Sequence, residues 1–529
     1  MGIVNFKKYT IMISLIFMIL ISAFLCIYAL ENYKSSNNTS QYSEFKSNGD
    51  AATENKNKQI EQNKGKMPLD ENMQPGFDDN KQPGSDGNIP AGGNVNHKYV
   101  PALTAYSGVF LILYIGSYYF FRRRNIEVDF ANEKLVICTL LFTGFLLRIA
   151  ASTLIEGYRG DIDLFKNWAV SAANSLSGVY SGSKPPDYPP LYMYILAVIG
   201  KIASISVLNS YYVILLKLPA IIADIITTYF IYRLGKKYFN AIISILLAAS
   251  YAFNPAIFID STLWGQVDSL FTLLIITGIF LLSEKKIIFS SSMFAVAVLM
   301  KPQGIIFFPI LFFELVQERK IRNFIYAALS AVATCIIIII PFAIKQESPI
   351  WIFNLYLNTI KEYPYASMNA FNLFSLLGAN FKKDTETLFL FNYHTIGMFF
   401  IVIITCISWL IYIKGNNRKF IASIALLQIA GVFTFSSGMH ERYLFPAVVL
   451  SVLAFVYLKD NRFIILSIGF SITTYVNILA ILFSIDSEVF NLLLKIVSLL
   501  NVILVIYVIK ILFNNAFTRI PELTTKEND

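Results

Sequence analysis

Long uncharged apolar runs recur along almost the whole chain, and they limit its possible folds more than any other feature. The first, Tyr9–Leu30, follows Lys7 and Lys8 and carries no charged side chain. A helix needs about 20 apolar residues to span the hydrocarbon core of a bilayer, and several runs reach that length. Hydrophobic residues make up 56% of the chain and charged residues 15%, against about 25% charged residues in soluble domains. The chain is therefore not an ordinary soluble enzyme, a disordered or fibrous protein, or a disulfide-stapled secreted module.

The net charge of +9 and the four cysteines give further information about the kind of membrane protein this chain forms. In a membrane protein an excess of Lys and Arg is typical of cytoplasmic loops. No basic patch interleaved with aromatic residues indicates a nucleic-acid surface. Each cysteine lies inside an apolar run without a partner at metal-binding spacing, so we interpret all four as small buried hydrophobic side chains: Cys26, Cys138, Cys335 and Cys406.

Alternation of apolar and polar stretches divides the chain into five parts. Residues 1–30 are predicted to form an uncleaved membrane anchor, because the apolar run is longer than that of a signal peptide and lacks a clear cleavage site. Residues 31–98 are rich in Asn, Lys, Gly, Pro, Ser and Asp, which predicts a disordered exoplasmic loop. Residues 99–124 are expected to form an additional transmembrane helix that ends at three arginines. Residues 135–513 are expected to form the main transmembrane domain, and residues 514–529 a polar C-terminal tail.

Charged loops predict which ends of the spans share a membrane face. We expect about 13 spans, with Lys- and Arg-rich connections in the cytoplasm. The segments expected on the exoplasmic face are Glu156–Pro190, Asp260–Asp268, Lys301–Gly304, Lys345–Lys383, Ser436–Arg442 and Ile485–Glu488. Ile287–Met300 and Ile305–Val316 are short and are expected to form a broken or tilted pair. Between Asp187 and Lys236 the chain needs an odd number of crossings although its apolar content indicates two, so either one piece is re-entrant or interfacial, or Pro219 divides the second.

Gly157–Trp168 is the most sharply patterned polar segment. Its apolar residues fall on one helical face, which predicts an amphipathic helix at the membrane surface. Asp161 is either the N-cap of this helix or an exoplasmic general base. Asp161 and Asp163 do not share a helical face. One of them is therefore expected to face the reaction and the other to support it.

Two further acidic segments follow. Asp187 precedes Tyr188 and two prolines that fix a kinked entry into a span, and it either caps that helix or lines the same cavity. The next segment carries two carboxylates, an indole and an amide between apolar runs: Asp260, Trp264, Gln266 and Asp268. Polar groups at membrane depth usually mark a site or a pathway, whereas charge costs little in an exposed loop. The sequence leaves both alternatives open.

Three further features complete the set of polar groups. Lys301 either snorkels toward water or binds a phosphate, and Asp224, deep in an apolar run, is expected to have a structural hydrogen-bonding role. A lone His is usually structural, but His440 is adjacent to Glu441 and Arg442 at the start of a span. Arginine can hold a phosphate in fork geometry, and a helix N-terminus also favours an anion.

Along the chain the acids come early and the bases late, all in segments expected on one membrane face. This arrangement suits a reaction between an acceptor hydroxyl and an anionic, lipid-linked donor. The base would remove the acceptor proton, the cations would hold the leaving phosphate, and the membrane would retain the lipid tail.

The order of these motifs resembles the GT-C superfamily of membrane glycosyltransferases. It is most similar to the bacterial Gpi18-like mannosyltransferases, and it is also similar to the dolichyl-phosphate-glucose-dependent glucosyltransferases of N-glycan precursor assembly. The resemblance covers about Leu135–Tyr457. The motifs that carry it are Gly160-Asp161-x-Asp163 with Trp168, Asp187–Leu191, Asn254-Pro255 with Asp260, Gly265–Ser269, Lys301-Pro302-Gln303, Asn369–Asn372 and His440-Glu441-Arg442.

The resemblance implies an all-α, polytopic, GT-C-like helix bundle, with 135–513 as its catalytic domain. The implied reaction is an inverting transfer of a hexose, mannose favoured over glucose, from a polyprenyl-phosphate donor. The acceptor would be a glycan, a lipid or a protein at the exoplasmic face of a multi-pass protein in the cell membrane. No cofactor and no metal are expected, because the sequence contains no compact ligand set.

The resemblance also assigns roles to residues. Asp161 matches the family's general base and Asp163 its neighbouring acidic position, where the glucosyltransferases often have Glu. His440 and Glu441 match a His-Glu-Lys motif with Arg442 in place of Lys, which is expected to bind the donor phosphate. The other residues expected to bind substrate are Trp168, Asp187, Tyr188, Asp260, Trp264, Gln266, Asp268, Lys301, Gln303, Asn369 and Asn372.

Two competing functions fit the same composition. A lipid-linked-sugar flippase or secondary transporter would also be polytopic, but it should place its polar residues near the membrane midplane on broken helices. Most polar residues of this chain gather in segments expected at the outer face, which favours the enzyme. An inactive relative that acts as an assembly partner is a weaker alternative, because every motif is present. The sequence does not identify the sugar or the acceptor.

Overall fold

The computed structural model describes residues 2–33, 97–124, 133–182 and 185–517. Most of the segment 31–98, predicted as a disordered loop, lies outside the described residues. The same holds for 518–529 of the predicted tail. The last helix continues to Phe517, so the tail does not begin at residue 514 as expected.

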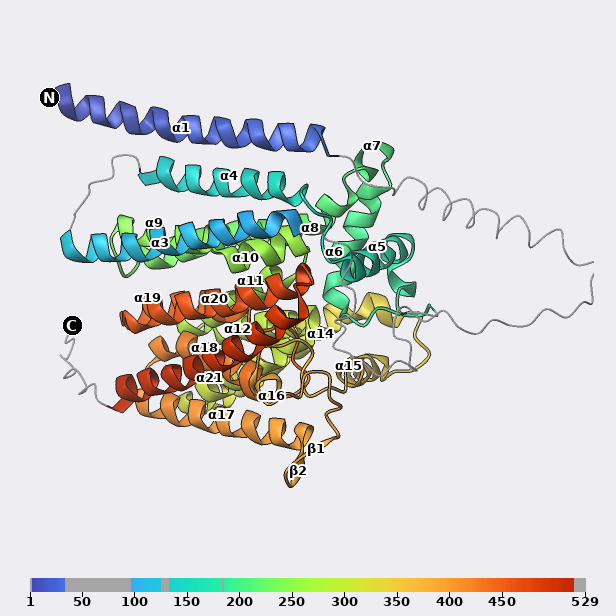
Figure 1. Cartoon of the computed structure of the whole chain (residues 1–529). Helices are drawn as coiled ribbons and strands as arrows, with labels where there is room; N and C mark the ends of the chain where they lie inside the picture. The colour runs from blue at the N-terminus through green and yellow to red at the C-terminus, as the bar shows by residue number, and fades with distance from the viewer. Residues whose placement is uncertain (1, 34–96, 125–132, 183–184, 518–529) are drawn as a thin grey trace, which may run out of the picture.

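The described residues form an all-α bundle whose long helices run side by side (Figure 1). Within these residues nine helices are long and apolar enough to cross a membrane, or ten if one bent pair counts as a span. Four shorter apolar helices, α6, α11, α12 and α19, accompany them. The expected all-α polytopic fold is confirmed, while the figure of about 13 spans is reached only when short helices are included.

The structure has the following elements. The long helices are α1 (Gly2–Glu31), α3 (Val100–Arg124), α4 (Glu133–Ser152), α8 (Tyr212–Gly235), α14 (Ile321–Ala343), α17 (Tyr393–Gly415), α18 (Ile421–Phe435), α20 (Arg462–Leu482) and α21 (Ser487–Phe517). The shorter α-helices are α5 (Arg159–Asn174), α6 (Pro190–Ala203), α7 (Ser206–Asn209), α9 (Ala241–Ala252), α10 (Pro255–Phe258), α11 (Asp268–Ser283), α12 (Ile287–Met300), α13 (Phe308–Glu318), α15 (Trp351–Lys361), α16 (Leu373–Leu376) and α19 (Pro446–Leu458). The remaining elements are the 3₁₀ turns η2 (His97–Tyr99), η3 (Leu176–Gly178), η5 (Pro302–Phe307) and η6 (Arg418–Phe420), the π-helix η4 (Ile259–Trp264), and the strands β1 (Thr387–Leu388) and β2 (Phe391–Asn392).

Burial separates a central pair of helices from the peripheral ones. Every residue of α19 and all of Ile421–Thr434 in α18 are buried. In α14, by contrast, only Ala327 and Phe342 are buried. A helix that is apolar all round is buried or faces lipid, so α18 and α19 form the protein core and α14 presents its apolar surface to the bilayer.

Breaks in the helices bring polar segments to one end of the bundle. The predicted break between Ile287–Met300 and Ile305–Val316 is present, because α12 ends at Met300 and η5 leads into α13. A second break was not predicted: α9 and the segment Pro255–Trp264 meet at 41°. Both breaks place backbone that is not regular α-helix next to the candidate site described below, where protein rather than lipid surrounds it.

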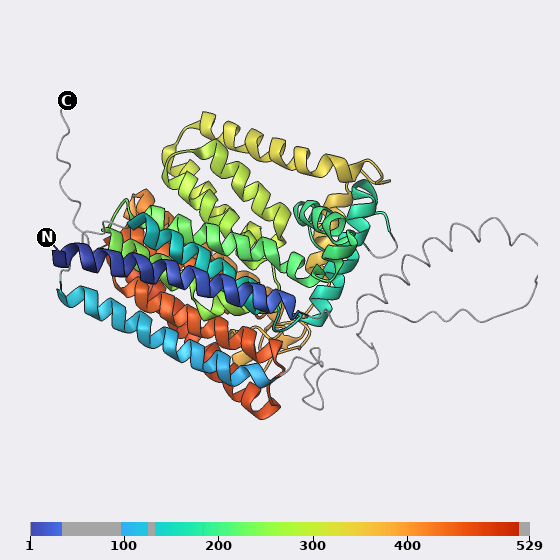
Figure 2. The same cartoon turned by 90° about the horizontal axis from the view of Figure 1, so that it is seen from above.

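The parity question between Asp187 and Lys236 has a structural answer. Helix α8 runs without interruption through Pro219, so the idea that this proline divides a span is wrong. Helix α6 has only 14 residues, and α5, α6 and α7 lie together beyond one end of the long helices (Figures 1 and 2). The chain therefore crosses the bundle once in this region, through α8.

Candidate active site

Two glycines join the segment before α5 to the end of η4. Gly157 has a φ of 116°, and a Cβ at this position would lie 2.3 Å from the carbonyl oxygen of Trp264. Gly265, with a φ of 89°, ends η4 in a left-handed conformation that favours glycine. The Tyr158 N–H donates to the Trp264 carbonyl across this junction at 3.4 Å. Only residues without a side chain allow so close an approach, and it brings the first turn of α5 against η4.

Asp161 receives two hydrogen bonds at this junction. Its Oδ2 accepts from Trp264 Nε1 at 2.6 Å and from Gln266 Nε2 at 2.5 Å. Its Oδ1 accepts no hydrogen bond from the described residues, and the side chain is 20% exposed. The N-cap alternative is wrong, because Tyr158 occupies the cap position of α5. One oxygen of Asp161 is therefore fixed and the other is open.

Asp163 does not join this group. Its carboxylate is 55% exposed and lies 3.7 Å from Nε of Arg159, one helical turn earlier. The side chain points to a different face of α5 from Asp161, as the spacing of two residues predicts. The structure thus separates the two acids that the sequence paired.

Lys301 and Asp268 form a buried ion pair beside Asp161. Lys301 Nζ lies 2.7 Å from Asp268 Oδ1, and only 2% of the Lys301 side chain is exposed. The snorkelling alternative is wrong, because the ammonium group ends inside the protein. Nζ also lies 5.7 Å from the centre of the Tyr188 ring. The Tyr188 hydroxyl donates to Gln266 Oε1 at 3.5 Å, which links the ion pair to the residues that hold Asp161.

Arg442 occupies the centre of the cluster. Its guanidinium lies 2.6 Å from Glu441 Oε1, 3.7 Å from Asp268 Oδ2 and 3.8 Å from Asp161 Oδ2. It also lies 5.3 Å from the centre of the Trp264 ring. Its Nε is buried and has no hydrogen-bond partner within the described residues. The early acids and the late arginine therefore meet at one place, as the order of the motifs predicts.

His440 forms part of the wall but is not a cation. Burial, together with the nearby charges of Arg442 and Lys301, lowers the pKa of His440 to about 3. Its ring packs edge-on against Tyr363 and also contacts Tyr443. Its backbone pairs with Asn369. A neutral, aromatic-packed imidazole positions this loop, whereas Arg442 supplies the charge.

Asp187 lies beside the cluster without capping a helix. The cap position of α6 is Pro189, so the capping alternative is wrong. Burial raises the pKa of Asp187 to about 7, and the charges of Glu362 and Asp161 add to the effect. Trp168 packs behind this region against Phe165 and Tyr188. Asp187 is therefore a buried acid next to the charged cluster, and the other alternative, that it lines a substrate cavity, stays a prediction.

Four further predicted residues make no side-chain hydrogen bond or ion pair with Asp161, Lys301 or Arg442 among the described residues. Asp260 is fully buried, and neither carboxylate oxygen has a hydrogen-bond partner within the described residues. Gln303 has a buried Oε1 that lacks one there as well. Asn369 bonds to Asn380, and Asn372 caps α16. These contacts give the two asparagines a role in shaping the loop before α17.

Sequence reasoning missed three residues near the site. Tyr158 stacks on Trp264 with ring centres 5.0 Å apart, and no signal in the sequence distinguishes it from the other tyrosines. Lys217 Nζ donates to the carbonyls of Ile155 and Ser152 at 2.7 and 3.2 Å. Arg148 pairs with Asp224 at 3.2 Å. Both are lone cations in apolar runs, which is a recognisable signal of a functional or structural intramembrane group.

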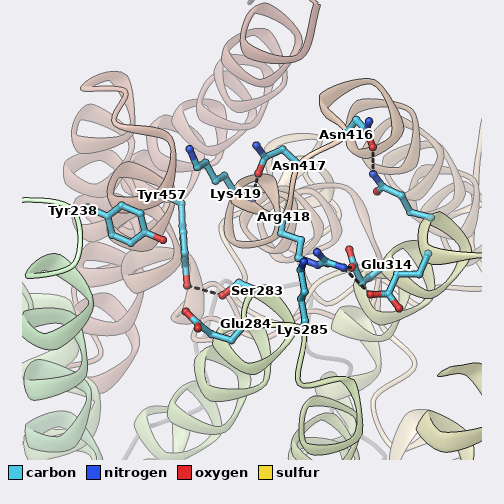
Figure 3. Close-up of a pocket in the computed structure, with 12 residues that line it drawn as sticks. Tyr238, Ser283, Glu284, Lys285, Glu314, Asn416, Asn417, Arg418, Lys419 and Tyr457 are labelled. Atoms are coloured by element: carbon cyan, nitrogen blue, oxygen red, sulfur yellow. Dashed lines mark hydrogen bonds and ion pairs between the residues drawn. The ribbon is translucent and has the colours of Figure 1, made fainter. Parts of the chain in front are cut away.

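A polar cavity away from this cluster is lined by Tyr238, Glu284, Arg418 and Tyr457 among others (Figure 3). Its volume is about 520 Å³, and none of the predicted site residues lines it. Arg418 pairs there with Glu314 at 2.5 Å and with Glu318 at 2.6 Å. Within the described residues no group of three His, Cys, Asp or Glu side chains is arranged to hold a metal ion.

A comparison with protein families matches part of the chain. A family model described as dolichyl-phosphate-mannose-protein mannosyltransferase matches residues 187–344. The matched region includes Asp187, Asp268 and Lys301 but neither Asp161 nor Arg442. No curated protein matches the chain significantly. The family match supports a membrane-bound glycosyltransferase of the GT-C superfamily.

Proposed function

We propose that this protein is an inverting glycosyltransferase that moves a hexose, mannose favoured over glucose, from a polyprenyl-phosphate donor to an acceptor hydroxyl. The observation that carries the proposal is the environment of Asp161, whose Oδ2 is held by two N–H donors while Oδ1 stays open. A general base needs this combination of fixed orientation and access to the proton. The description of the matching family model supports a lipid-linked mannose as the donor.

The proposed step is a single displacement. Asp161 Oδ1 takes the proton of the acceptor hydroxyl while the acceptor oxygen forms a bond to the anomeric carbon. The bond between that carbon and the phosphate oxygen breaks, and its electron pair leaves with the polyprenyl phosphate. Attack opposite the leaving group inverts the anomeric centre. Glu441 and Asp268 contact Arg442 and Lys301, so both are better suited to orient these cations than to act as a nucleophile.

Arg442 and Lys301 are the proposed partners of the leaving phosphate. Charge that develops on the phosphate is stabilised by cations that are fixed in a site that excludes water. The Nε of Arg442 has no hydrogen-bond partner among the described residues, and Arg442 contacts both Asp161 and Asp268. One guanidinium can therefore lie between the base and the leaving group.

The charge distribution supports an exoplasmic site. Lys and Arg accumulate in cytoplasmic loops, and the end of the bundle opposite the candidate site carries Lys236, Lys237, Lys285, Arg418 and Lys419. The site end would then face the outside of the cell membrane, where a lipid-linked sugar can meet a glycan, lipid or protein acceptor.

Asp161→Asn tests the proposal, with Asp163→Asn as its matched control on the same helix. Both variants are reconstituted in liposomes with a radiolabelled polyprenyl-phosphate mannose and membrane-derived acceptors. Asp161→Asn should lose transfer by about a hundredfold to ten-thousandfold, because it removes the base, while Asp163→Asn should retain most of it. Full transfer by Asp161→Asn would refute the assigned base. Movement of unaltered donor across the bilayer without glycosidic bond formation would favour the transporter instead.

A further inference from the structure

An apolar pocket opens between α3 and the rest of the bundle. Its volume is about 330 Å³. Its lining includes Leu103 and Tyr106 on α3, Gly144, Arg148 and Ala151 on α4, and Leu263 on η4. Helix α3 lies along an edge of the bundle in Figure 2. Tyr106 ties α3 to the bundle by donating from its hydroxyl to the Phe253 carbonyl at 2.5 Å.

Arg148 is the unusual group in this pocket. Only 2% of its side chain is exposed, and its Nε donates to Asp224 Oδ2 at 3.2 Å. Its Nη2 is buried and has no hydrogen-bond partner within the described residues. A buried donor of a charged group that lacks an acceptor is unfavourable for the folded protein. An oxygen from a bound molecule would satisfy it, and the apolar lining restricts that molecule to one that is mostly hydrocarbon.

The depth of Arg148 indicates which part of a lipid it meets. Arg148 lies four residues before Ser152, the last residue of α4, which is about 6 Å along the helix axis. The polar interfacial layer on each side of the hydrocarbon core is about 5–8 Å thick. If α4 ends near the membrane surface, Arg148 lies where the glycerol ester groups of phospholipids are found.

We propose that this pocket binds a glycerophospholipid, with an acyl chain against Leu103 and Leu263 and an ester carbonyl oxygen accepting from Arg148 Nη2. Arg148 Nη2 needs an oxygen acceptor within an apolar pocket, and the isoprenoid chain of a polyprenyl donor has no oxygen apart from its phosphate. In the proposed function Arg442 and Lys301 bind that phosphate. The lipid site is therefore distinct from the donor site, and it does not depend on the proposed reaction.

Bonds through Asp224 connect the lipid site to η4. Asp224 Oδ2 accepts from Arg148 and also from the Ser261 hydroxyl at 2.6 Å. Ser261 lies three residues before Trp264, which holds Asp161. Occupancy of the pocket thus supports the π-helix on which the candidate site is built, and a bound phospholipid should stabilise the folded protein.

Filling the pocket tests the proposal. Ala151→Trp and, independently, Leu103→Trp place an indole in it from opposite walls. Phe142→Trp is the matched control, because Phe142 lies on α4, is 59% exposed and does not line the pocket. The purified full-length proteins are compared by native mass spectrometry and by thermal unfolding in detergent, with and without added phosphatidylglycerol.

The wild type and Phe142→Trp should retain a phospholipid and gain thermal stability when phosphatidylglycerol is added. Both pocket variants should unfold at a similar temperature to the wild type without lipid, retain at least tenfold less phospholipid, and gain no stability on its addition. A wild type that retains no phospholipid would overturn the proposal. Retention of a polyprenyl phosphate in its place, or equal loss of lipid in Phe142→Trp, would overturn it as well.

Discussion

Trp264 and Asp161 are 103 residues apart in the sequence, yet the Trp264 indole N–H donates to Asp161 Oδ2 at 2.6 Å. Gln266 donates to the same oxygen at 2.5 Å. Two donors on one oxygen fix the rotation of the carboxylate and direct its other oxygen away from η4. The indole ring also contacts the guanidinium of Arg442. A single side chain therefore positions both the proposed base and the proposed phosphate-binding cation.

Trp264→Phe should slow sugar transfer while leaving the protein folded. The substitution keeps a ring against Tyr158 but removes the N–H that holds Asp161. A hydrogen bond to a charged group is worth about 1.5–3 kcal/mol, so kcat should fall by about 10- to 100-fold. Single-turnover transfer measures the effect. Trp168→Phe is the control, because Trp168 makes ring contacts and has no hydrogen bond to Asp161. Equal losses in both variants would contradict the positioning role of the indole N–H.

Lys301→Met should lower the free energy of unfolding, although methionine is close to lysine in size. The substitution leaves Asp268 buried without its closest cation, and breaking a buried ion pair from one side costs about 3–5 kcal/mol. Replacing both partners with apolar residues, in Lys301→Met with Asp268→Leu, should recover much of that loss. Thermal unfolding in detergent gives the coupling between the two positions. A double variant less stable than Lys301→Met would contradict the pairing.

The main outline of the fold follows from the sequence because apolar runs and charged loops report on the membrane directly. The break at Lys301–Gly304 was predicted from the short lengths of the flanking runs, and the structure has it. The bend between α9 and α10 and the uninterrupted course of α8 through Pro219 were not predicted. Both depend on whether neighbouring helices make hydrogen bonds to the backbone groups that a break or a proline leaves free. A single run of sequence carries no information about those neighbours.

Local motifs predicted several residues that the structure brings together, but not how these residues are arranged. Asp161, Trp264, Asp268, Lys301 and Arg442 all occur in the motifs, and the structure brings them together. Which acid faces the cluster could not be decided locally, because it depends on the junction between Gly157 and the end of η4. Nor could the charge of His440, since its pKa is set by burial that the whole fold produces.

Asp187→Asn should change how stability depends on pH. Burial raises the pKa of Asp187 to about 7 from an ordinary value of 3.8. Between these values the folded protein keeps a proton that the unfolded chain has lost, so this group makes the protein less stable as pH rises. The variant lacks that penalty. Its unfolding temperature relative to the wild type should therefore increase from pH 4 to about pH 7 and then level off. Thermal unfolding at a series of pH values measures it, and a constant difference would contradict the raised pKa.

His440→Gln should show the opposite slope over an overlapping range. The pKa of His440 falls from 6.5 to about 3 in the folded protein, so below pH 6.5 the unfolded chain binds a proton that the folded protein does not. This group therefore stabilises the fold less as pH falls from 6.5 toward 3. Glutamine does not titrate, so His440→Gln does not lose this stability at low pH. Its unfolding temperature relative to the wild type should therefore rise as pH is lowered through this range.

The two variants together separate the groups. In the wild type the two effects oppose each other between about pH 4 and 6.5, so its own curve conceals both. Asp187→Asn combined with His440→Gln should show the sum of the two single differences, provided that the groups titrate independently. For each single variant, the difference in unfolding temperature from the wild type is plotted against pH. If the two plots had slopes of the same sign, one of the two pKa shifts would be wrong. If the double variant differed from the wild type by more or less than this sum, the two groups would interact across the site.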